Sequence, residues 1–282
     1  MIVNHRYDPS AIVIRDIESF DEMREVEELQ KEVWEFADLD VVPRTMFVAS
    51  IEVGAVLVGA YDGPALVGFV YGFPGYENGQ AVHHSHMLAV KPEYRSLNLG
   101  YKLKLAQRDR VLTQDIAQIT WTFDPLQSRN AYFNFAKLGV IAGSYRVDFY
   151  GKATSSFLHQ AGTDRLWVSW LVDSERVRDR LNEERKLSVL PDGTQPLVEV
   201  GIDLAPKMTG SPDLQGGLLT IEIPGEINAL QTEKPGLAVE WRKATRWAFS
   251  YALTRGYVVA EFYRGTLRDQ PIGSYLLRRA EN

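Results

Sequence analysis

The spacing of apolar residues changes from a helical to a strand pattern shortly after residue 51, and this change narrows the choice of fold more than any other feature. Over residues 19–36 apolar side chains recur every three or four positions among charged ones, and Ser19 precedes two acids that suit a helix start. A second helix is predicted over residues 45–51, after Pro43, a residue suited to a first helical turn. Beyond it the apolar runs are short, which predicts a layered α/β or α+β domain.

The strands of this domain are predicted from short apolar runs that are bounded by turn residues and rich in β-branched and aromatic side chains. The runs cover residues 11–15, 55–61, 65–71, 81–91, 116–123, 145–150 and 166–172. Helices are predicted over residues 101–112 and 130–138, the second closed by Gly139 as a cap, and a glycine-rich turn over residues 74–79. We therefore expect the first domain to span residues 1–172.

The remaining third of the chain predicts a helix and linker over residues 173–196 and a smaller α+β domain over residues 197–282. Its strands are predicted at residues 197–202, 218–223, 257–263 and 274–279, with a helix at 236–254. The order strand, loop, helix, strand is similar to that of residues 87–123, which leaves open a degenerate half-repeat of the first domain. The aromatic residues of the helix are expected in the core or at a dimer contact rather than in a ligand site. They are Trp241, Trp247, Phe249 and Tyr251.

Composition excludes several classes of protein. The absence of cysteine rules out disulfide scaffolds, thiolate nucleophiles, zinc ribbons and iron–sulfur clusters. A net charge of −6 argues against a nucleic-acid partner. No apolar run approaches the roughly 20 residues that span a bilayer, and residues 1–10 lack the order of a secretory signal. We expect a soluble cytoplasmic protein with no membrane partner. The glycine-rich motifs of ATP and dinucleotide sites and the zincin and serine-hydrolase motifs are also absent.

One segment predicts a binding site for an anion. After the strand that ends at Val90, a polar loop leads to Gly100, which opens a basic helix. The amides at a helix start have no partner within the helix and attract negative charge. Gly100 has no Cβ to keep a ligand from the backbone, and Asn98 tolerates left-handed geometry. Six basic and two acidic residues give the stretch from Lys91 to Arg110 a local charge of +4. The alternative interpretation is a solvated helix face beside a turn.

Residues 88–100 resemble the acyl-CoA signature of the GNAT superfamily of N-acyltransferases, in which a Val-x-Pro strand end precedes Arg/Gln-x-x-Gly-x-Gly/Ala. Arg95 and Gly100 match this pattern, and Asn98 replaces its first glycine. Residues 130–139 are similar to the family's Asn-x-x-Ala…Tyr-x-Lys-x-Gly-Phe helix. The resemblance implies a mixed, mostly antiparallel sheet flanked by helices, in a branch of the family with a C-terminal extension.

The resemblance also implies transfer of an acyl group from acyl-CoA to an amine by direct attack, without a metal. Acetyl-CoA is the default donor, succinyl-CoA stays open, and a small molecule such as an amino acid is the expected acceptor. Pantetheine would run along Leu88, Ala89 and Val90, and the amide of Leu88 would polarise the thioester carbonyl. The distal arm would meet the helix that carries Asn130 and Phe133. The pyrophosphate would lie on Arg95 and on the amides of Ser96, Leu97, Asn98, Leu99, Gly100 and Tyr101.

Proton transfer points to the histidines. His84 and His86 lie two apart on a predicted strand and share a face, so either is a candidate base, and His83 faces the other way. They could instead be packed side chains, and a metal site is not expected. At the position where many family members place a tyrosine acid this chain has Phe135, so Tyr132 one turn earlier, or water, would protonate the leaving thiolate.

Four further residues are weaker candidates. Asp124 ends a strand and could hold a substrate ammonium or orient a base, although a role in capping the turn is the stronger interpretation. Arg44, Arg129 and Arg146 could bind a substrate carboxylate, or be surface residues. The C-terminal domain is expected to complete the acceptor pocket or to form an oligomer interface, for example in a homodimer. Two other functions stay open: an acyl-CoA sensor without catalysis, which Phe135 favours, and an interaction module unrelated to coenzyme A.

Overall fold

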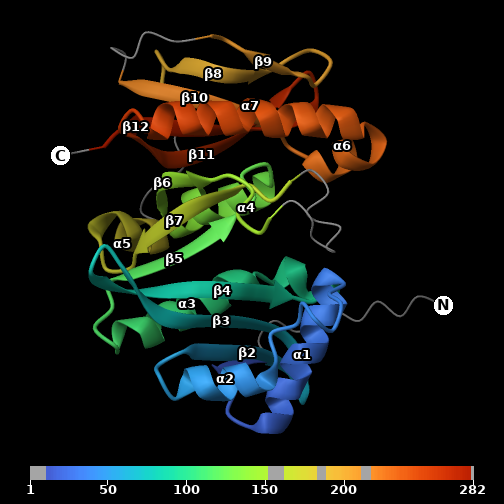
Figure 1. Cartoon of the computed structure of the whole chain (residues 1–282), viewed down its shortest axis with the longest axis vertical. Coiled ribbons are helices and arrows are strands. Elements are labelled where there is room, and N and C mark those ends of the chain that lie inside the picture. Colours follow the sequence, from blue (N-terminus) through green and yellow to red (C-terminus); the bar gives the residue numbers. More distant parts are fainter. Residues whose placement is uncertain (1–10, 152–161, 183–188, 211–216, 281–282) are drawn as a thin grey trace. The chain divides into compact units, whose positions relative to one another are not determined.

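The computed structural model describes residues 11–151, 162–182, 189–210 and 217–280, and Figure 1 shows the course of the chain. The prediction that residues 1–10 lack a secretory signal concerns residues outside these ranges. The chain divides into two compact units, residues 1–120 and 121–282, so the division falls within a strand rather than at residue 172. A boundary between functional domains at residue 172 stays a prediction. Among the described residues, no helix is both long and apolar enough to cross a bilayer.

The first unit is built on a mixed, mostly antiparallel sheet, as predicted. Strands β1 to β4 lie in chain order, and each is antiparallel to the next. The fifth strand, β5, runs parallel to β4. The strands are β1 (Ile12–Asp16), β2 (Val56–Asp62), β3 (Ala65–Glu77), β4 (Gln80–Val90) and β5 (Gln118–Phe123).

Helices cover both faces of this sheet. The helices α1 (Phe20–Trp34) and α2 (Arg44–Ile51) form as predicted, and Ser19 caps α1 through a reciprocal capping box with Glu22. Side chains of α1 share one core with Tyr71 of β3 and Met87 of β4. The helix α3 (Leu99–Leu112) contacts residues of β3 and β4 whose side chains point the other way, such as Gly68 and Ser85. It therefore covers the opposite face of the sheet.

The predicted turn over residues 74–79 is wrong, because β3 continues through Pro74 to Glu77 and the chain turns at Asn78 and Gly79. Proline donates no backbone hydrogen bond and is tolerated where a strand has a free edge. The ladder between β2 and β3 ends at Gly72, so Pro74 pairs only with His83 of β4 and needs no second partner.

The ladder between β3 and β4 contains one extra residue. Tyr71 pairs with Met87 and Gly72 pairs with Ser85, so His86 is a β-bulge. Gly72 is required here, because a Cβ would meet His83 Nε2 at 2.4 Å and the His84 carbonyl oxygen at 2.7 Å. The bulge therefore lies beside a position of β3 that has no room for a side chain.

The second unit begins with the last three residues of β5, and its other strands lie in the order β7-β6-β11-β12-β10-β8-β9. The helix predicted at 130–138 is a short α-helix followed by a π-helix, and Gly139 closes it with φ of 75°. The elements are α4 (Ser128–Ala131), η2 (Tyr132–Leu138), β6 (Ile141–Arg146), β7 (Arg165–Leu171), α5 (Glu175–Leu181), β8 (Gln195–Val200), β9 (Pro206–Met208), β10 (Leu218–Pro224), α6 (Ile227–Glu233), α7 (Pro235–Leu253), β11 (Tyr257–Leu267) and β12 (Gln270–Arg279).

The C-terminal strands and the long helix form as predicted, whereas β9 and α6 were not predicted. The predicted helix and linker over 173–196 contains α5, and its residues 183–188 lie outside the described residues. The strand order differs from that of residues 87–123, because β12 lies between β10 and β11, whereas β4 pairs directly with β5.

Candidate functional site

The C-terminal half of β4 presents a backbone edge, which we call the β4 edge and define as Ser85–Val90. The ladder between β4 and β5 consists of the pairs His83–Ile119 and His84–Thr120, and within the described strands it goes no further. The amide of Lys91 donates to the Val67 carbonyl of β3 at 2.9 Å. Because successive amides of a strand point to opposite edges, those of Val90 and Leu88 point away from β3, outward from the β4 edge.

The segment after β4 is a short 3₁₀-helix, η1 (Pro92–Leu97), and two contacts hold it in place. The Tyr94 hydroxyl donates to Asp62 Oδ2 at 2.8 Å, which fixes η1 to β2. Arg95 Nε donates to the Val90 carbonyl at 3.3 Å, which brings this guanidinium to the end of the β4 edge. Ser96 and Leu97 lie within η1, and their contact with an anion stays a prediction.

The start of α3 has the geometry that an anion site needs. Asn98 is left-handed, with φ of 57° and ψ of 24°, as expected of the residue in place of a glycine. The amides of Tyr101 and Lys102 both donate to the Asn98 carbonyl, so the Leu99 and Gly100 amides precede the first bonds of the helix.

Gly100 borders open space. A Cβ built on it would meet only the Leu88 side chain, at 3.8 Å, which is ordinary contact. Packing within the protein therefore does not require glycine at this position. An anionic group could therefore approach the helix amides here without meeting a side chain of residue 100.

His84 and His86 share a face of the sheet, as predicted, with their ring centroids 6.4 Å apart. Both rings contact Phe73 on the face that α1 and α2 cover. His84 Nδ1 lies 3.1 Å from Thr120 Oγ1, and His86 is the more exposed of the two. Burial lowers the pKa of His84 to about 4, with smaller contributions from His86 and Lys104. Desolvation also lowers the pKa of His86, without a contribution from a neighbouring charge.

His83 is fully buried on the opposite face, and its Nε2 lies 3.3 Å from Gln107 Nε2 of α3. Burial, followed by the charges of Lys104 and His84, lowers its pKa to about 3. The three histidines therefore point to two faces and do not converge. Within the described ranges, no group of three histidine, aspartate or glutamate side chains is placed to hold a metal ion.

A buried polar cluster that was not predicted from the sequence lies beneath these histidines; we call it the α3 cluster, and it consists of His83, Ser85, Lys104 and Gln107. Lys104 Nζ donates to Ser85 Oγ at 2.6 Å and to Gln107 Oε1 at 3.2 Å. Burial lowers the pKa of Lys104 to about 7. A sequence signal existed, because Gln107 lies four residues from both Leu103 and Val111 on the apolar stripe of α3.

The candidates in the second unit have structural contacts. Asp124 Oδ1 caps the amide of Leu126 at 2.9 Å, and its carboxylate binds Arg242 in a forked pair. Tyr132 is half-buried beneath the Arg264 guanidinium, 4.0 Å from the ring centroid. Phe135 is fully buried and packs edge-on against Tyr275. These contacts favour a structural role for Asp124.

The three arginine candidates also have contacts within the protein. Arg44 is bonded to Glu27 through its amide and lies over the Phe20 ring, and exposed Arg129 pairs with Glu226. Arg146 lies over the Trp167 ring. Asn130 is exposed and Phe133 is half-buried, both in the second unit, and their role in binding coenzyme A stays a prediction.

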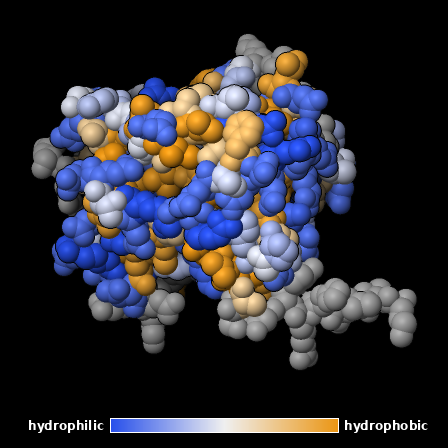
Figure 2. All heavy atoms as spheres, turned by 90° about the horizontal axis from the view of Figure 1, so that it is seen from below, coloured by the Kyte–Doolittle hydropathy of each residue, from blue (hydrophilic) through white to orange (hydrophobic). Residues whose placement is uncertain are grey.

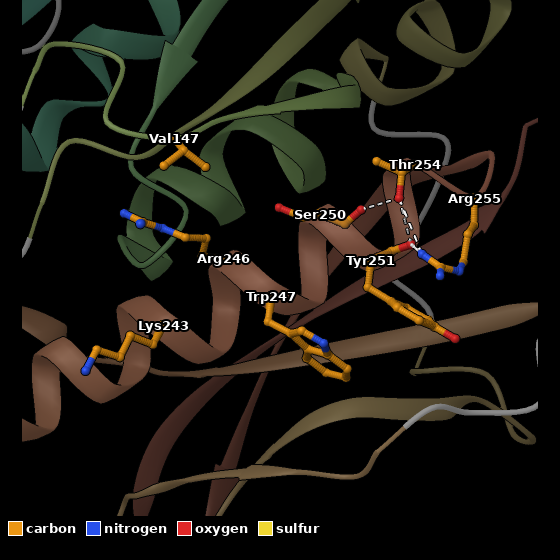
Figure 3. Close-up of a pocket in the computed structure, with 8 residues that line it drawn as sticks. All are labelled: Val147, Lys243, Arg246, Trp247, Ser250, Tyr251, Thr254 and Arg255. Carbon is orange, nitrogen blue, oxygen red and sulfur yellow. Dashed lines mark hydrogen bonds between the residues drawn. The ribbon is translucent and has the colours of Figure 1, made fainter.

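The aromatic residues of α7 fall into two groups. Trp241 and Phe249 are buried in the core, as predicted. Trp247 and Tyr251 are half-buried, stack at 5.5 Å and line an open pocket of about 650 Å³ (Figure 3). The other lining residues are Val147, Lys243, Arg246, Ser250, Thr254 and Arg255. This outer pair is therefore not fully buried, and the predicted core or dimer contact stays a prediction for it.

Apolar side chains also reach the surface of the first unit. Met46, Val48 and Val53, in and just after α2, are exposed. Figure 2 shows hydrophobic areas set among hydrophilic side chains on the face viewed from below. The outer side of α2 is thus partly apolar, on the same face of the sheet as His84 and His86.

Comparisons with known proteins agree with the residues that form this site. Residues 17–139 match the family described as the acetyltransferase (GNAT) family, which covers the β4 edge, η1 and α3. None of the proteins with a curated function matches the sequence significantly.

Many solved structures resemble part of the chain. One is the ribosomal-protein-S18-alanine N-acetyltransferase from Escherichia coli, 12% identical, with 58% of this chain and 95% of that chain covered at a TM-score of 0.46. Another is aminoglycoside 6'-acetyltransferase type Ii, 18% identical, with 58% and 99% covered at 0.47. A third is Arabidopsis thaliana Naa50 in complex with a bisubstrate analogue, 15% identical, with 56% and 97% covered at 0.43. At these values the likeness says nothing about the substrate of this chain.

Proposed function

We propose that the protein is an N-acyltransferase that moves an acyl group, by default acetyl, from acyl-CoA to the amine of a small molecule, because residues 17–139 match the acetyltransferase (GNAT) family. The observation that carries the proposal is the position of two backbone features side by side. The amides of Leu88 and Val90 point outward from the β4 edge. The amides of Leu99 and Gly100 lie at the start of α3, next to this edge.

The residues present fit an acyl-CoA thioester. The Leu99 and Gly100 amides would hold the diphosphate, with Arg95 close by, because helix-start amides and a guanidinium both favour phosphate oxygens. Pantetheine would pair with the β4 edge as an added strand. The amide of Leu88 would donate to the thioester oxygen, where negative charge develops during attack, and one such donor can contribute roughly 3 kcal/mol.

The transfer needs no covalent enzyme intermediate. The amine nitrogen forms a bond to the thioester carbon, the carbon–sulfur bond breaks, and the sulfur leaves with the electron pair. A base must accept the proton that the amine loses. His86 is the better candidate, because a base works best with a pKa near the working pH and His84 is shifted down to about 4. His84 would then orient the amine or the ring of His86.

No tyrosine acid stands at position 135. Phe135 is fully buried among aromatic rings and offers no proton. A thiolate is a fair leaving group, so water would protonate it, and the role of Tyr132 as an alternative acid stays a prediction. We propose a small amine as the acceptor, because the sequence contains no long acidic or basic tract for docking a protein substrate.

The test is a thiol-release assay with acetyl-CoA and succinyl-CoA against a pool of amino acids and other small amines. The proposal expects release of coenzyme A that depends on one of the amines. Coenzyme A should also raise the melting temperature, since a ligand at 100 times its dissociation constant adds about 2.7 kcal/mol of stability. Binding without release for any amine would contradict the enzyme and support a second function.

That second function is an acyl-CoA sensor without catalysis. Buried Phe135 in place of the usual acid favours it. A protein whose melting temperature does not respond to coenzyme A at all would be neither enzyme nor sensor, and would agree with an interaction module.

A further inference from the structure

The α3 cluster fastens the inner side of β4 to the helix. Ser85 Oγ lies 2.8 Å from Gln107 Oε1 and 2.6 Å from Lys104 Nζ, so two side chains of α3 hold one hydroxyl of the strand. Gln107 reaches His83 with its nitrogen, at 3.3 Å. All four side chains are buried. Two inward-pointing residues of β4 are thus bonded to one turn of α3.

This attachment lies where the pairing of β4 with its neighbouring strands is least regular. The ladder to β5 ends at His84, and the ladder to β3 is interrupted by the bulge at His86. Ser85 lies between these two points. A strand with a bulge and a free edge has more freedom than one held by two regular ladders, and hydrogen bonds from α3 restore that constraint.

We propose that Lys104 and Gln107 are positioning residues for His84 and His86. His84 lies between His83 and Ser85 in a strand whose side chains alternate, so fixing the inward direction of these two fixes the outward direction of His84. His86 follows Ser85 directly and shares the face of His84, so its start is fixed by the same hydroxyl. This inference rests on the proposed function in one respect, namely that His84 and His86 handle the proton of the amine.

The chemistry of the cluster supports this role over packing alone. Burying a lysine costs free energy, which an apolar side chain of similar length would avoid. Burial lowers the pKa of Lys104 to about 7, which records that cost. Gly72 has no room for a side chain, because a Cβ would also meet Gln107 Nε2 at 2.8 Å. The sheet and α3 are therefore closely packed at the cluster.

The test compares Lys104→Met and Gln107→Met with Gln114→Met. Gln114 donates to the Gly54 carbonyl at 3.0 Å just beyond α3, so the same chemical change is made away from the cluster. Ser85→Ala, which removes one oxygen, is the milder variant if either methionine fails to fold. We expect kcat to fall roughly 10- to 100-fold in the cluster variants, with the KM for acyl-CoA unchanged. Gln114→Met should keep the kcat of the wild type.

Imidazole NMR signals give a readout that does not depend on turnover. In Lys104→Met the loss of a positive charge raises the pKa of His84 whatever its orientation, so Gln107→Met and Ser85→Ala decide the question. In these two variants the signals of His84 and His86 should shift together. Unmoved signals, or moved signals with unchanged kcat, overturn the proposal. A wild-type protein that binds coenzyme A but acylates no amine refutes the enzyme, and the resonances then decide the positioning alone.

Discussion

Arg242 donates two parallel hydrogen bonds to Asp124, from Nη1 at 2.8 Å and from Nη2 at 2.7 Å. Both side chains are largely buried, at 5% and 12% exposure, and they join the end of β5 to the middle of α7. Burial alone would lower the pKa of Arg242, but the carboxylate of Asp124 outweighs it and raises this pKa. The pair is a structural link, because both carboxylate oxygens of Asp124 accept hydrogen bonds from Arg242.

Asp124→Asn should therefore destabilise the protein, because it leaves the Arg242 charge buried without its carboxylate. We expect a loss of about 3–5 kcal/mol in the free energy of unfolding, measured by urea denaturation. The double variant Asp124→Leu, Arg242→Met should recover much of it, since two apolar side chains avoid the cost of desolvation. A loss below about 1 kcal/mol in the single variant would contradict a buried ion pair.

Gly100→Asp should weaken the binding of coenzyme A by tenfold or more, because its carboxylate would repel the diphosphate at the start of α3. The control is Gly100→Ala, whose Cβ meets Leu88 at an ordinary 3.8 Å, so that it folds normally and isolates the loss of space from the added charge. Isothermal titration with coenzyme A measures both variants. Equal affinity for Gly100→Asp and the wild type would refute this location of the diphosphate.

His86→Gln should lower kcat/KM roughly 10²- to 10⁴-fold, as expected on removal of a general base, and His84→Gln should lower it less. The reason is that burial and two neighbouring charges bring the pKa of His84 to about 4, too low for an efficient base near neutral pH. Rates of thiol release across the pH range test this. The reverse order of the two variants would assign the base to His84.

Stability should rise with pH above neutrality because of Lys104. Burial lowers its pKa from 10.5 to about 7, so between these values the unfolded chain binds a proton that the folded protein does not. The free energy of unfolding should then increase by about 2 kcal/mol from pH 7 to pH 9, below the range where tyrosines titrate. Lys104→Met should flatten this rise in urea denaturation. An equally steep rise in the variant would assign it to other groups.

The local features of the site could be predicted from the sequence. Asn98 takes the left-handed conformation expected of it, and the two histidines share a face because side chains alternate in a strand. The turn over 74–79 could not, because Pro74 and Gly75 are read as turn residues unless the register with β4 is known.

Contacts between distant residues were beyond the sequence. Asp124 and Arg242 lie 118 positions apart, and nothing near either one indicates the other. Lys104 looks like one more base on a basic helix until α3 is packed on the sheet and Ser85 lies beneath it. The elements that were missed, β9 and α6, are too short for a periodic pattern to develop.

The bulge at His86 keeps the orientation of the residues that follow it independent of His86 itself. A one-residue slip normally reverses every later side chain of a strand. Here the extra residue lies on the same side as Met87, so a chain without His86 would keep Met87 in its core and Leu88 against α3. Evolution could thus add or discard this imidazole without rebuilding the scaffold that carries it.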